Sequence, residues 1–189
     1  MSLYSNKFDK TKMLKTLKIL GNKLQNSGID YEIYLFGSCL GMYLLDKKYR
    51  MSLDVDFQSK DTINSTEIKD FMELLNVHEI GGIMNIPPLD ELEIIDEFTF
   101  GSLTVKIPSI ENFALSKLLS DRPKDYNDLK SYPILDSCNI DQLRKLLDEY
   151  LDYFPFRDNP NYNFNYFNEL LLERKLKWNP KSTYKSWFF

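Results

Sequence analysis

The stretch Tyr34–Phe57, which reads YLFGSCLGMYLLDKKYRMSLDVDF, decides the fold of this chain. The apolar run that leads into it predicts a β-strand over Tyr31–Phe36, and Gly37-Ser38 then interrupts the run with a turn. A short helix is expected over Leu40–Asp46, and a second strand over Leu53–Phe57. This order of elements predicts an α+β fold with a small mixed β-sheet flanked by helices, followed by a C-terminal helical portion.

Two carboxylates stand close together on the second predicted strand. Asp54 and Asp56 are two residues apart, so their side chains point to one face, whereas Val55 and Phe57 point to the other face and into a core. Carboxylates this close repel each other unless a cation lies between them. Mg²⁺, or Mn²⁺ in its place, prefers oxygen ligands and leaves room for phosphate oxygens. The pair therefore predicts a metal site, although a solvated strand edge also carries this pattern.

Gly37-Ser38 supplies a second feature beside the acidic pair. A glycine after a strand lets the backbone turn sharply and approach a ligand closely. Successive N–H groups at such a turn, or at the start of the next helix, can hold a phosphate. The hydroxyl of Ser38 adds a further polar group. By itself, a Gly-Ser pair is also typical of an ordinary loop.

Taken together, these motifs resemble the nucleotidyltransferase superfamily related to DNA polymerase β. The form Arg-x-Ser-x-Asp-x-Asp is similar to that of its minimal bacterial members. The resemblance implies metal binding by the two aspartates and nucleotide binding by the residues upstream of them. The matching residues are Gly37, Ser38, Arg50, Ser52, Asp54 and Asp56.

A third carboxylate is expected on a neighbouring hairpin. Strands are predicted over Leu92–Phe100 and Leu103–Ile107, joined across Gly101-Ser102. Two-metal phosphoryl transfer uses a further acidic ligand or a base. Glu93 is the first candidate and Asp96 the second. A charged, exposed strand edge explains either residue equally well.

The segment Pro108–Tyr132 sharpens the resemblance. A lysine within a helix, followed by Arg-x-Lys-Asp-x-x-Asp, resembles the third motif of the AbiEii/AbiGii-type toxin nucleotidyltransferases of bacteria. In that family the lysine contacts NTP phosphates, and the aspartates are expected to orient the basic side chains. A helix–loop–helix with surface ion pairs is the alternative. The matching residues are Lys117, Arg122, Lys124, Asp125 and Asp128.

Composition limits the class of protein. The chain has 189 residues, of which 43% are hydrophobic, so it can bury a core. We expect a nucleotidyltransferase domain over residues 1–135 and a helical region over 136–189.

A net charge of −4 argues against a strongly basic nucleic-acid-binding protein. Two cysteines give no disulfide framework, and the single histidine, His78, argues against a histidine-rich zinc site. With no apolar run long enough for a membrane, a cytoplasmic protein is expected.

The remaining segments are mainly helical. Helices are predicted over Lys10–Gln25, from Ser65 or Thr66 to about Asn76, over Ile140–Tyr150 and over Tyr166–Lys177. Val77–Ile86 fits no single element, although Gly81-Gly82 marks a turn within it. The tail Trp178–Phe189 mixes aromatic side chains with lysines, which favours docking onto the protein or a partner and is also compatible with base stacking.

The predicted reaction is Mg²⁺-dependent transfer of NMP from an NTP to an acceptor hydroxyl. By resemblance, the acceptor is RNA such as tRNA, or a protein, and a toxin with an antitoxin partner is implied. Two alternatives stand beside this prediction. One is a small-molecule nucleotidyltransferase of the aminoglycoside type, and the other is a non-catalytic binding module with the same fold.

Overall fold

The computed structural model describes residues 7–80, 87–152 and 154–176 of the chain. The chain divides into two units, Met1–Phe113 and Ala114–Phe189, and the division falls within helix α4 (Ile110–Leu118). The predicted turn at Gly81-Gly82 and the tail Trp178–Phe189 lie outside the described residues. No helix among the described residues is long and apolar enough to cross a membrane.

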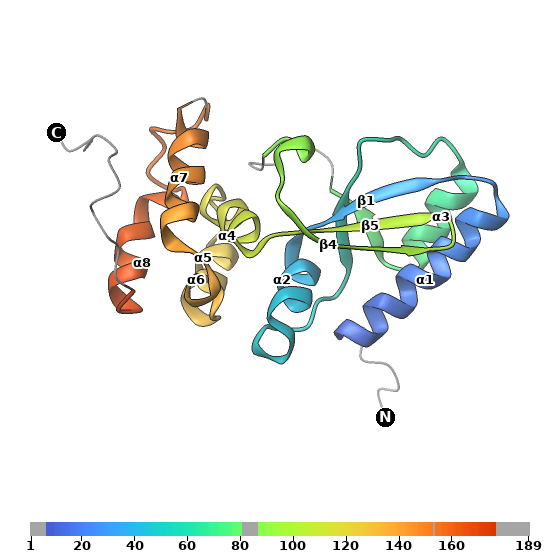
Figure 1. The fold of residues 1–189 in the computed structure, drawn as a ribbon, viewed down its shortest axis with the longest axis horizontal. Coiled ribbons are helices and arrows are strands. Elements are labelled where there is room, and N and C mark those ends of the chain that lie inside the picture. Colours follow the sequence, from blue (N-terminus) through green and yellow to red (C-terminus); the bar gives the residue numbers. More distant parts are fainter. Residues whose placement is uncertain (1–6, 81–86, 153, 177–189) are drawn as a thin grey trace. The chain divides into compact units, whose positions relative to one another are not determined.

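The first unit is built on a five-stranded mixed sheet, which confirms the predicted α+β class (Figure 1). The strand order is β3-β2-β1-β5-β4. The central strand β1 runs parallel to β5 and antiparallel to β2, β3 runs parallel to β2, and β4 runs antiparallel to β5. The strands are β1 (Tyr31–Leu35), β2 (Val55–Gln58), β3 (Val77–Glu79), β4 (Ile94–Phe100) and β5 (Leu103–Pro108).

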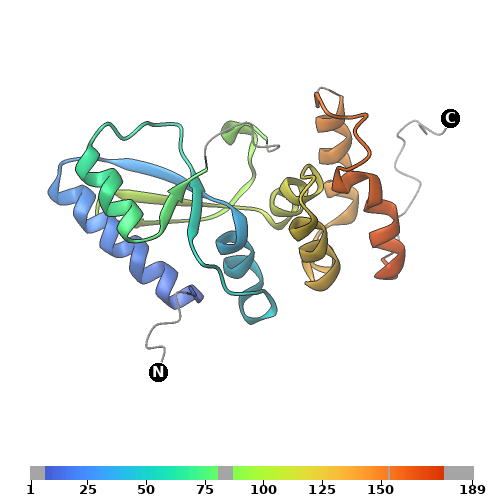
Figure 2. The same ribbon diagram turned by 180° about the vertical axis from the view of Figure 1, so that it is seen from behind.

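Three helices cover one face of this sheet. They are α1 (Lys10–Asn26), α2 (Gly37–Leu45) and α3 (Thr66–Leu74). Helix α1 packs against β4 and β5 and contacts both other helices, and from behind α3 lies alongside it (Figure 2). Side-chain caps explain where two of them begin. The carboxylate of Asp9 accepts the Lys12 N–H at 2.7 Å at the start of α1, and Ser65 caps α3.

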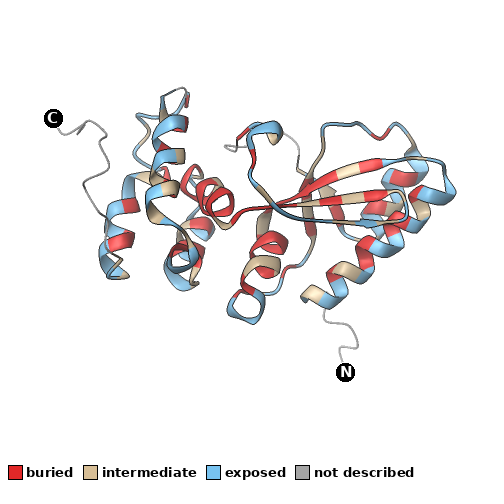
Figure 3. Ribbon diagram, viewed as in Figure 1, coloured by how far each residue is buried: buried red, intermediate tan, exposed pale blue. Residues whose placement is uncertain are grey.

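Alternation along the strands separates a covered face from an open one (Figure 3). Ile33 lies beside Val105 in the register of β1 and β5, and both are fully buried beneath the helices. On the other face, the Lys106 ammonium lies 3.3 Å from the Glu32 carboxylate and 2.6 Å from that of Glu97. The open face therefore carries a row of charged side chains across three strands.

One end of the open face is covered by apolar side chains. Tyr34, Phe36 and Leu92 are buried together there. Ile80 and Leu89 pack against this cluster from the segments that flank residues 81–86. The open face of the sheet is thus covered by apolar side chains at the end where β1 leads into α2.

The second unit is helical. Pro123 opens α5, as expected for a residue whose missing N–H costs nothing in the first turn, and Asn139 caps α7. After the second half of α4, its elements are α5 (Pro123–Ser131), α6 (Ile134–Ser137), α7 (Ile140–Leu151), the 3₁₀ turn η3 (Asn163–Tyr166) and α8 (Phe167–Glu173).

Several predicted boundaries were wrong by one or more residues. The second strand begins at Val55 rather than Leu53, so Asp54 lies in a bend before the sheet. The hairpin begins at Ile94, because a 3₁₀ turn (Leu89–Glu91) precedes it, and Glu93 therefore lies just outside β4. The last helix is shorter than predicted and ends at Glu173.

Candidate active site

The first part of the site is the start of α2, where β1 ends. Gly37 has a φ of 59°, a left-handed conformation that glycine adopts without steric cost. Phe36 precedes it as the N-cap residue and makes no side-chain cap. The first N–H groups of a helix have no acceptor within the helix and carry its positive dipole end. This turn can therefore bind an anion, although the side chain of Ser38 is itself only 6% exposed.

Asp56 lies directly against this turn. Its carbonyl accepts the Phe36 N–H at 2.9 Å, which fixes β2 beside the end of β1. A Cβ atom placed on Gly37 would overlap the Asp56 carboxylate. The tertiary structure thus brings together two of the predicted site residues, and only a residue without a side chain leaves room for the carboxylate.

Replacing Gly37 with Ala is expected to damage the site more than its backbone strain alone explains. A left-handed conformation costs a non-glycine residue about 1–2 kcal/mol, and here the added methyl group must also displace the Asp56 carboxylate. Gly28→Ala is the matched control, because Gly28 has a φ of 64° and nothing lies within 4 Å of its Cβ position. Urea unfolding and nucleotide binding should both be poorer for Gly37→Ala, and equal losses in the two variants would contradict this reading.

Asp54 is held differently, because it lies outside the strand. The hydroxyl of Ser52 donates a hydrogen bond to Asp54 Oδ1 at 3.1 Å, and Ser52 is 1% exposed. Arg50, the first residue of the motif, lies over the ring of Tyr49 at 5.5 Å. The resemblance assigns Ser52 to nucleotide binding, whereas in the structure its hydroxyl donates a hydrogen bond to Asp54.

The donor set fits Mg²⁺ with a nucleotide bound. Within the described parts of the chain, no three His, Cys, Asp or Glu side chains gather as a metal site. Mg²⁺, however, is commonly bound by one or two carboxylates together with substrate phosphates and water. Asp54 and Asp56, both partly exposed, can supply the protein ligands for that arrangement.

The two candidates for a third carboxylate lie in different surroundings. Glu93 is exposed, and its carbonyl accepts the Ser109 N–H at 2.9 Å. Asp96 accepts a hydrogen bond from the hydroxyl of Tyr43, on α2, at 2.5 Å. Burial and this hydrogen bond raise the pKa of Tyr43 to about 12, so the phenol stays protonated. Asp96 therefore joins β4 to α2, and the third ligand stays a prediction, with Glu93 the first candidate and Asp96 the second.

Cys39 is a part of the site that sequence motifs missed. Its Sγ donates to the carbonyl of Phe36 at 2.9 Å and lies 3.3 Å from that of Asp56. Burial, with a smaller contribution from the Asp56 charge, raises the pKa of the thiol well above its ordinary value. The residue stays a neutral hydrogen-bond donor that links α2 to β2, and no motif places a cysteine there.

The lysine of the third motif is buried in the second unit. Lys117 is 4% exposed, and its Nζ donates to Asp125 Oδ1 at 2.8 Å and to Asp128 Oδ2 at 2.7 Å. Arg122, whose side chain is 68% exposed, donates from Nε to Asp125 Oδ2 at 2.7 Å. Asn163 donates to the Lys117 carbonyl at 2.9 Å. These hydrogen bonds therefore connect Lys117 on α4 to α5 and η3 within the second unit.

The aspartates thus bond the basic side chains, and their role in orienting these side chains toward a nucleotide stays a prediction. Lys124, by contrast, is exposed. Contact of Lys117, Arg122 and Lys124 with NTP phosphates stays a prediction.

The buried aspartate predicts acid sensitivity. Burial raises the pKa of Asp125, but the charge and hydrogen bond of Lys117, with help from Ser120, outweigh burial and leave the pKa below its ordinary value. A carboxyl group with a lowered folded-state pKa stabilises the protein above its unfolded pKa of about 3.9, and this stabilisation is lost as pH falls through the folded pKa. Urea unfolding from about pH 6 to about pH 3 should show a shallower loss for Asp125→Asn than for the wild type. An equally steep loss in both would contradict the assignment.

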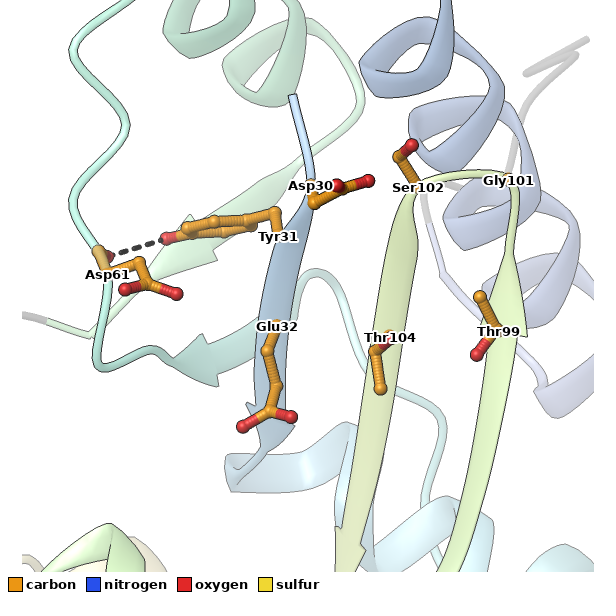
Figure 4. Close-up of a pocket in the computed structure, with 8 residues that line it drawn as sticks. All are labelled: Asp30, Tyr31, Glu32, Asp61, Thr99, Gly101, Ser102 and Thr104. Carbon is orange, nitrogen blue, oxygen red and sulfur yellow. Dashed lines mark hydrogen bonds between the residues drawn. The ribbon is translucent and has the colours of Figure 1, made fainter. Parts of the chain in front are cut away.

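A pocket lies at the other end of β1 from Gly37 (Figure 4). Its volume is about 260 Å³, and the hydroxyl of Tyr31 at its edge donates to the Asp61 carbonyl. Asp30 and Asp61 form no ion pair with any residue that the structure describes, whereas Glu32 is paired with Lys106. Its lining is acidic and rich in hydroxyl groups, and consists of Asp30, Tyr31, Glu32, Asp61, Thr99, Gly101, Ser102 and Thr104.

Comparison with known proteins gives one match. No curated protein and no solved structure matches the chain. The sequence pattern of one protein family matches residues 12–175, which cover both the Gly37–Asp56 site and the Lys117 cluster. The chain therefore belongs to this family, which is described as a nucleotidyltransferase of unknown function (DUF6036).

Proposed function

We propose that the protein transfers NMP from an NTP to a hydroxyl group of an acceptor, which is RNA such as tRNA or a protein, with the help of Mg²⁺. Membership of a nucleotidyltransferase family implies the NTP. The observation that carries the proposal is the closeness of the Asp56 carboxylate to Gly37. The Asp56 carboxylate lies at a helix start, a position that can bind phosphate oxygens, and this supports its proposed role as a metal ligand.

Each part of the site has a role in this proposal. The N–H groups at the start of α2 bind phosphate oxygens, and Asp54 and Asp56 hold the metal. Bound Mg²⁺ would offset the charge on the phosphates and on the attacking and leaving oxygens. The acceptor oxygen bonds to the α-phosphorus, the bond to the bridging oxygen breaks, and pyrophosphate leaves. Glu93 is the proposed third ligand or the base that takes the hydroxyl proton.

The test uses each of the four NTPs labelled at the α-phosphate. The protein is incubated with Mg²⁺ and either total cellular RNA or total cellular protein. Label in one pool, and none with the Asp54→Asn, Asp56→Asn variant, would establish the reaction and the class of acceptor together. A wild-type protein that labels neither pool and shows no Mg²⁺-dependent thermal shift with any NTP would instead favour the non-catalytic binding module.

The toxin role rests on the AbiEii/AbiGii resemblance and belongs to the same proposal. Induced expression of the wild type should arrest bacterial growth, whereas the double Asn variant should not. An antitoxin partner would relieve the arrest when co-expressed. Equal growth with both proteins would remove the toxin role without touching the transfer reaction.

A second candidate function is transfer to a small amine-bearing acceptor of the aminoglycoside type. The pocket at the start of β1 supports it, because its carboxylates and hydroxyl groups suit a cationic polyol, and an acceptor held there would have to extend along β1 to bring a hydroxyl group to the acidic pair. Label from the NTP should then appear on an aminoglycoside, and Asp30→Asn should raise its KM while leaving NTP binding unchanged. Label on RNA alone would exclude this candidate.

A further inference from the structure

Asp54 lacks the support that Asp56 has from the sheet. Asp56 lies within β2, in register with His78 of β3, and its carbonyl is bonded to Phe36. Asp54 lies in the bend before the strand and is therefore not fixed by pairing with a neighbouring strand. A carboxylate that must meet a metal ion needs a fixed orientation. Something outside the sheet must therefore hold it.

The side-chain partner of Asp54 is Ser52. Its hydroxyl donates to Asp54 Oδ1 at 3.1 Å, which leaves the remaining lone pairs of the carboxylate for a cation. At 1% exposure, Ser52 is shielded from water, although Met51 and Leu53 on either side of it are 53% and 61% exposed. The residue that bonds the aspartate is thus buried between two exposed neighbours.

The N-terminal segment holds Ser52 in turn. Phe8 and Ser52 form an isolated antiparallel bridge, in which the Phe8 N–H donates to the Ser52 carbonyl at 2.6 Å and the Ser52 N–H donates to the Phe8 carbonyl at 3.2 Å. Phe8 is 3% exposed, and the next residue, Asp9, caps α1. Because α1 packs on β4 and β5, the bridge ties the loop to the rigid body of the unit.

We propose that Ser52 is a positioning residue for Asp54, and that the Phe8–Ser52 bridge keeps it in place. The inference rests on the proposed function, because it assigns the serine hydroxyl to orientation of a metal ligand rather than to the nucleotide. By this inference Phe8, which precedes the acidic pair by more than forty residues, also supports the site.

The variants separate the hydroxyl and the bridge from general stability. Ser52→Ala removes the hydroxyl and Ser52→Thr keeps one. Phe8→Pro removes the N–H of the bridge, and Phe8→Leu keeps it. Ser59→Ala is the matched control, because the Ser59 hydroxyl also bonds within the first unit, to the Glu32 carbonyl at 2.7 Å, away from the acidic pair.

The measurement is Mn²⁺ binding followed by electron paramagnetic resonance, with an NTP analogue that has a methylene bridge between its α- and β-phosphorus atoms. Loss of a group that orients a metal ligand weakens metal affinity by about 10–100-fold. We expect a loss of this size for Ser52→Ala, recovery in Ser52→Thr, and a smaller loss for Phe8→Pro than for Ser52→Ala. Phe8→Leu and Ser59→Ala should bind Mn²⁺ like the wild type, while thermal unfolding reports any general loss of stability.

Three outcomes would overturn the inference while leaving the proposed function intact: wild-type Mn²⁺ affinity in Ser52→Ala, no recovery in Ser52→Thr, or an equal loss in Ser59→Ala. If Ser52→Ala binds Mn²⁺ normally but loses affinity for the NTP analogue, the hydroxyl contacts the nucleotide instead. A wild-type protein that binds no Mn²⁺ with the analogue and transfers no label would overturn the function and this inference together.

Discussion

Replacing both Asp54 and Asp56 with Asn is expected to reduce NMP transfer by at least about 10³-fold, because a catalytic metal contributes several kcal/mol and each 1.36 kcal/mol is a factor of ten. The amide keeps the size of each side chain but removes the negative charge that holds the cation. Both side chains are partly exposed, so the fold should survive the change. Steady-state transfer of the α-labelled phosphate measures the effect.

The control for this variant changes the same amount of charge elsewhere in the unit. Asp70 and Asp90 are both exposed, and Asp70→Asn with Asp90→Asn alters the net charge equally. That protein should transfer at the wild-type rate, and circular dichroism should show native secondary structure in both. Undiminished turnover in the Asp54, Asp56 double variant would falsify the proposed site.

Replacing Lys117 with Met is expected to destabilise the second unit by about 3–5 kcal/mol, because it leaves buried carboxylates without their cation. Asp125 and Asp128 are each 3% exposed, and both bond the Lys117 ammonium. Asp125 would still accept hydrogen bonds from Arg122 and Ser120. Urea unfolding followed by far-ultraviolet circular dichroism measures the change.

Two further variants test the reason for this loss. Lys130→Met removes a lysine whose ammonium lies 3.0 Å from Glu173 on the surface, and it should leave the unfolding midpoint unchanged because solvent screens the pair. Adding Asp128→Asn to Lys117→Met should restore part of the stability, because it removes a buried negative charge that the lysine no longer balances. No restoration, or an equal loss in Lys130→Met, would show that the buried charges are not the cause.

The two kinds of effect also separate the roles of the predicted residues. A variant of the acidic pair should lose transfer and keep its stability, whereas Lys117→Met should lose stability first. If Lys117→Met keeps its stability and loses only affinity for the NTP, the phosphate contact implied by the resemblance would be the better assignment for this lysine.

Local sequence determined the fold class and most of the elements. Val55 and Phe57 alternate with the two aspartates along the chain. This alternation predicted that Val55 and Phe57 lie in the core, where both are fully buried. The turn signals at Gly37 and Gly101 marked the ends of β1 and β4, because a left-handed backbone favours glycine wherever it occurs. Capping by Asp9 and Ser65 is likewise a property of a few neighbouring residues.

The candidate site was predicted only in part. Sequence order placed Gly37 near the acidic pair, and the family match covers both. It could not place Asp54 outside the strand, since a strand boundary depends on which residues find partners in the sheet. Nor could it show that Asp96 bonds Tyr43 while Glu93 lies just outside β4, because both are acids near the start of one predicted strand.

What the sequence alone determined is therefore what short-range periodicity and turn chemistry encode: the α+β class, the order of elements and the residue types of the site. Only the tertiary structure decided that Asp56 fills the space left by Gly37, that Lys117 is enclosed by two carboxylates, and that Phe8 supports the loop of Ser52. These contacts join residues far apart in the chain. Their partners are chosen by packing and by the need to satisfy buried polar groups, and neither is visible in any local stretch of sequence.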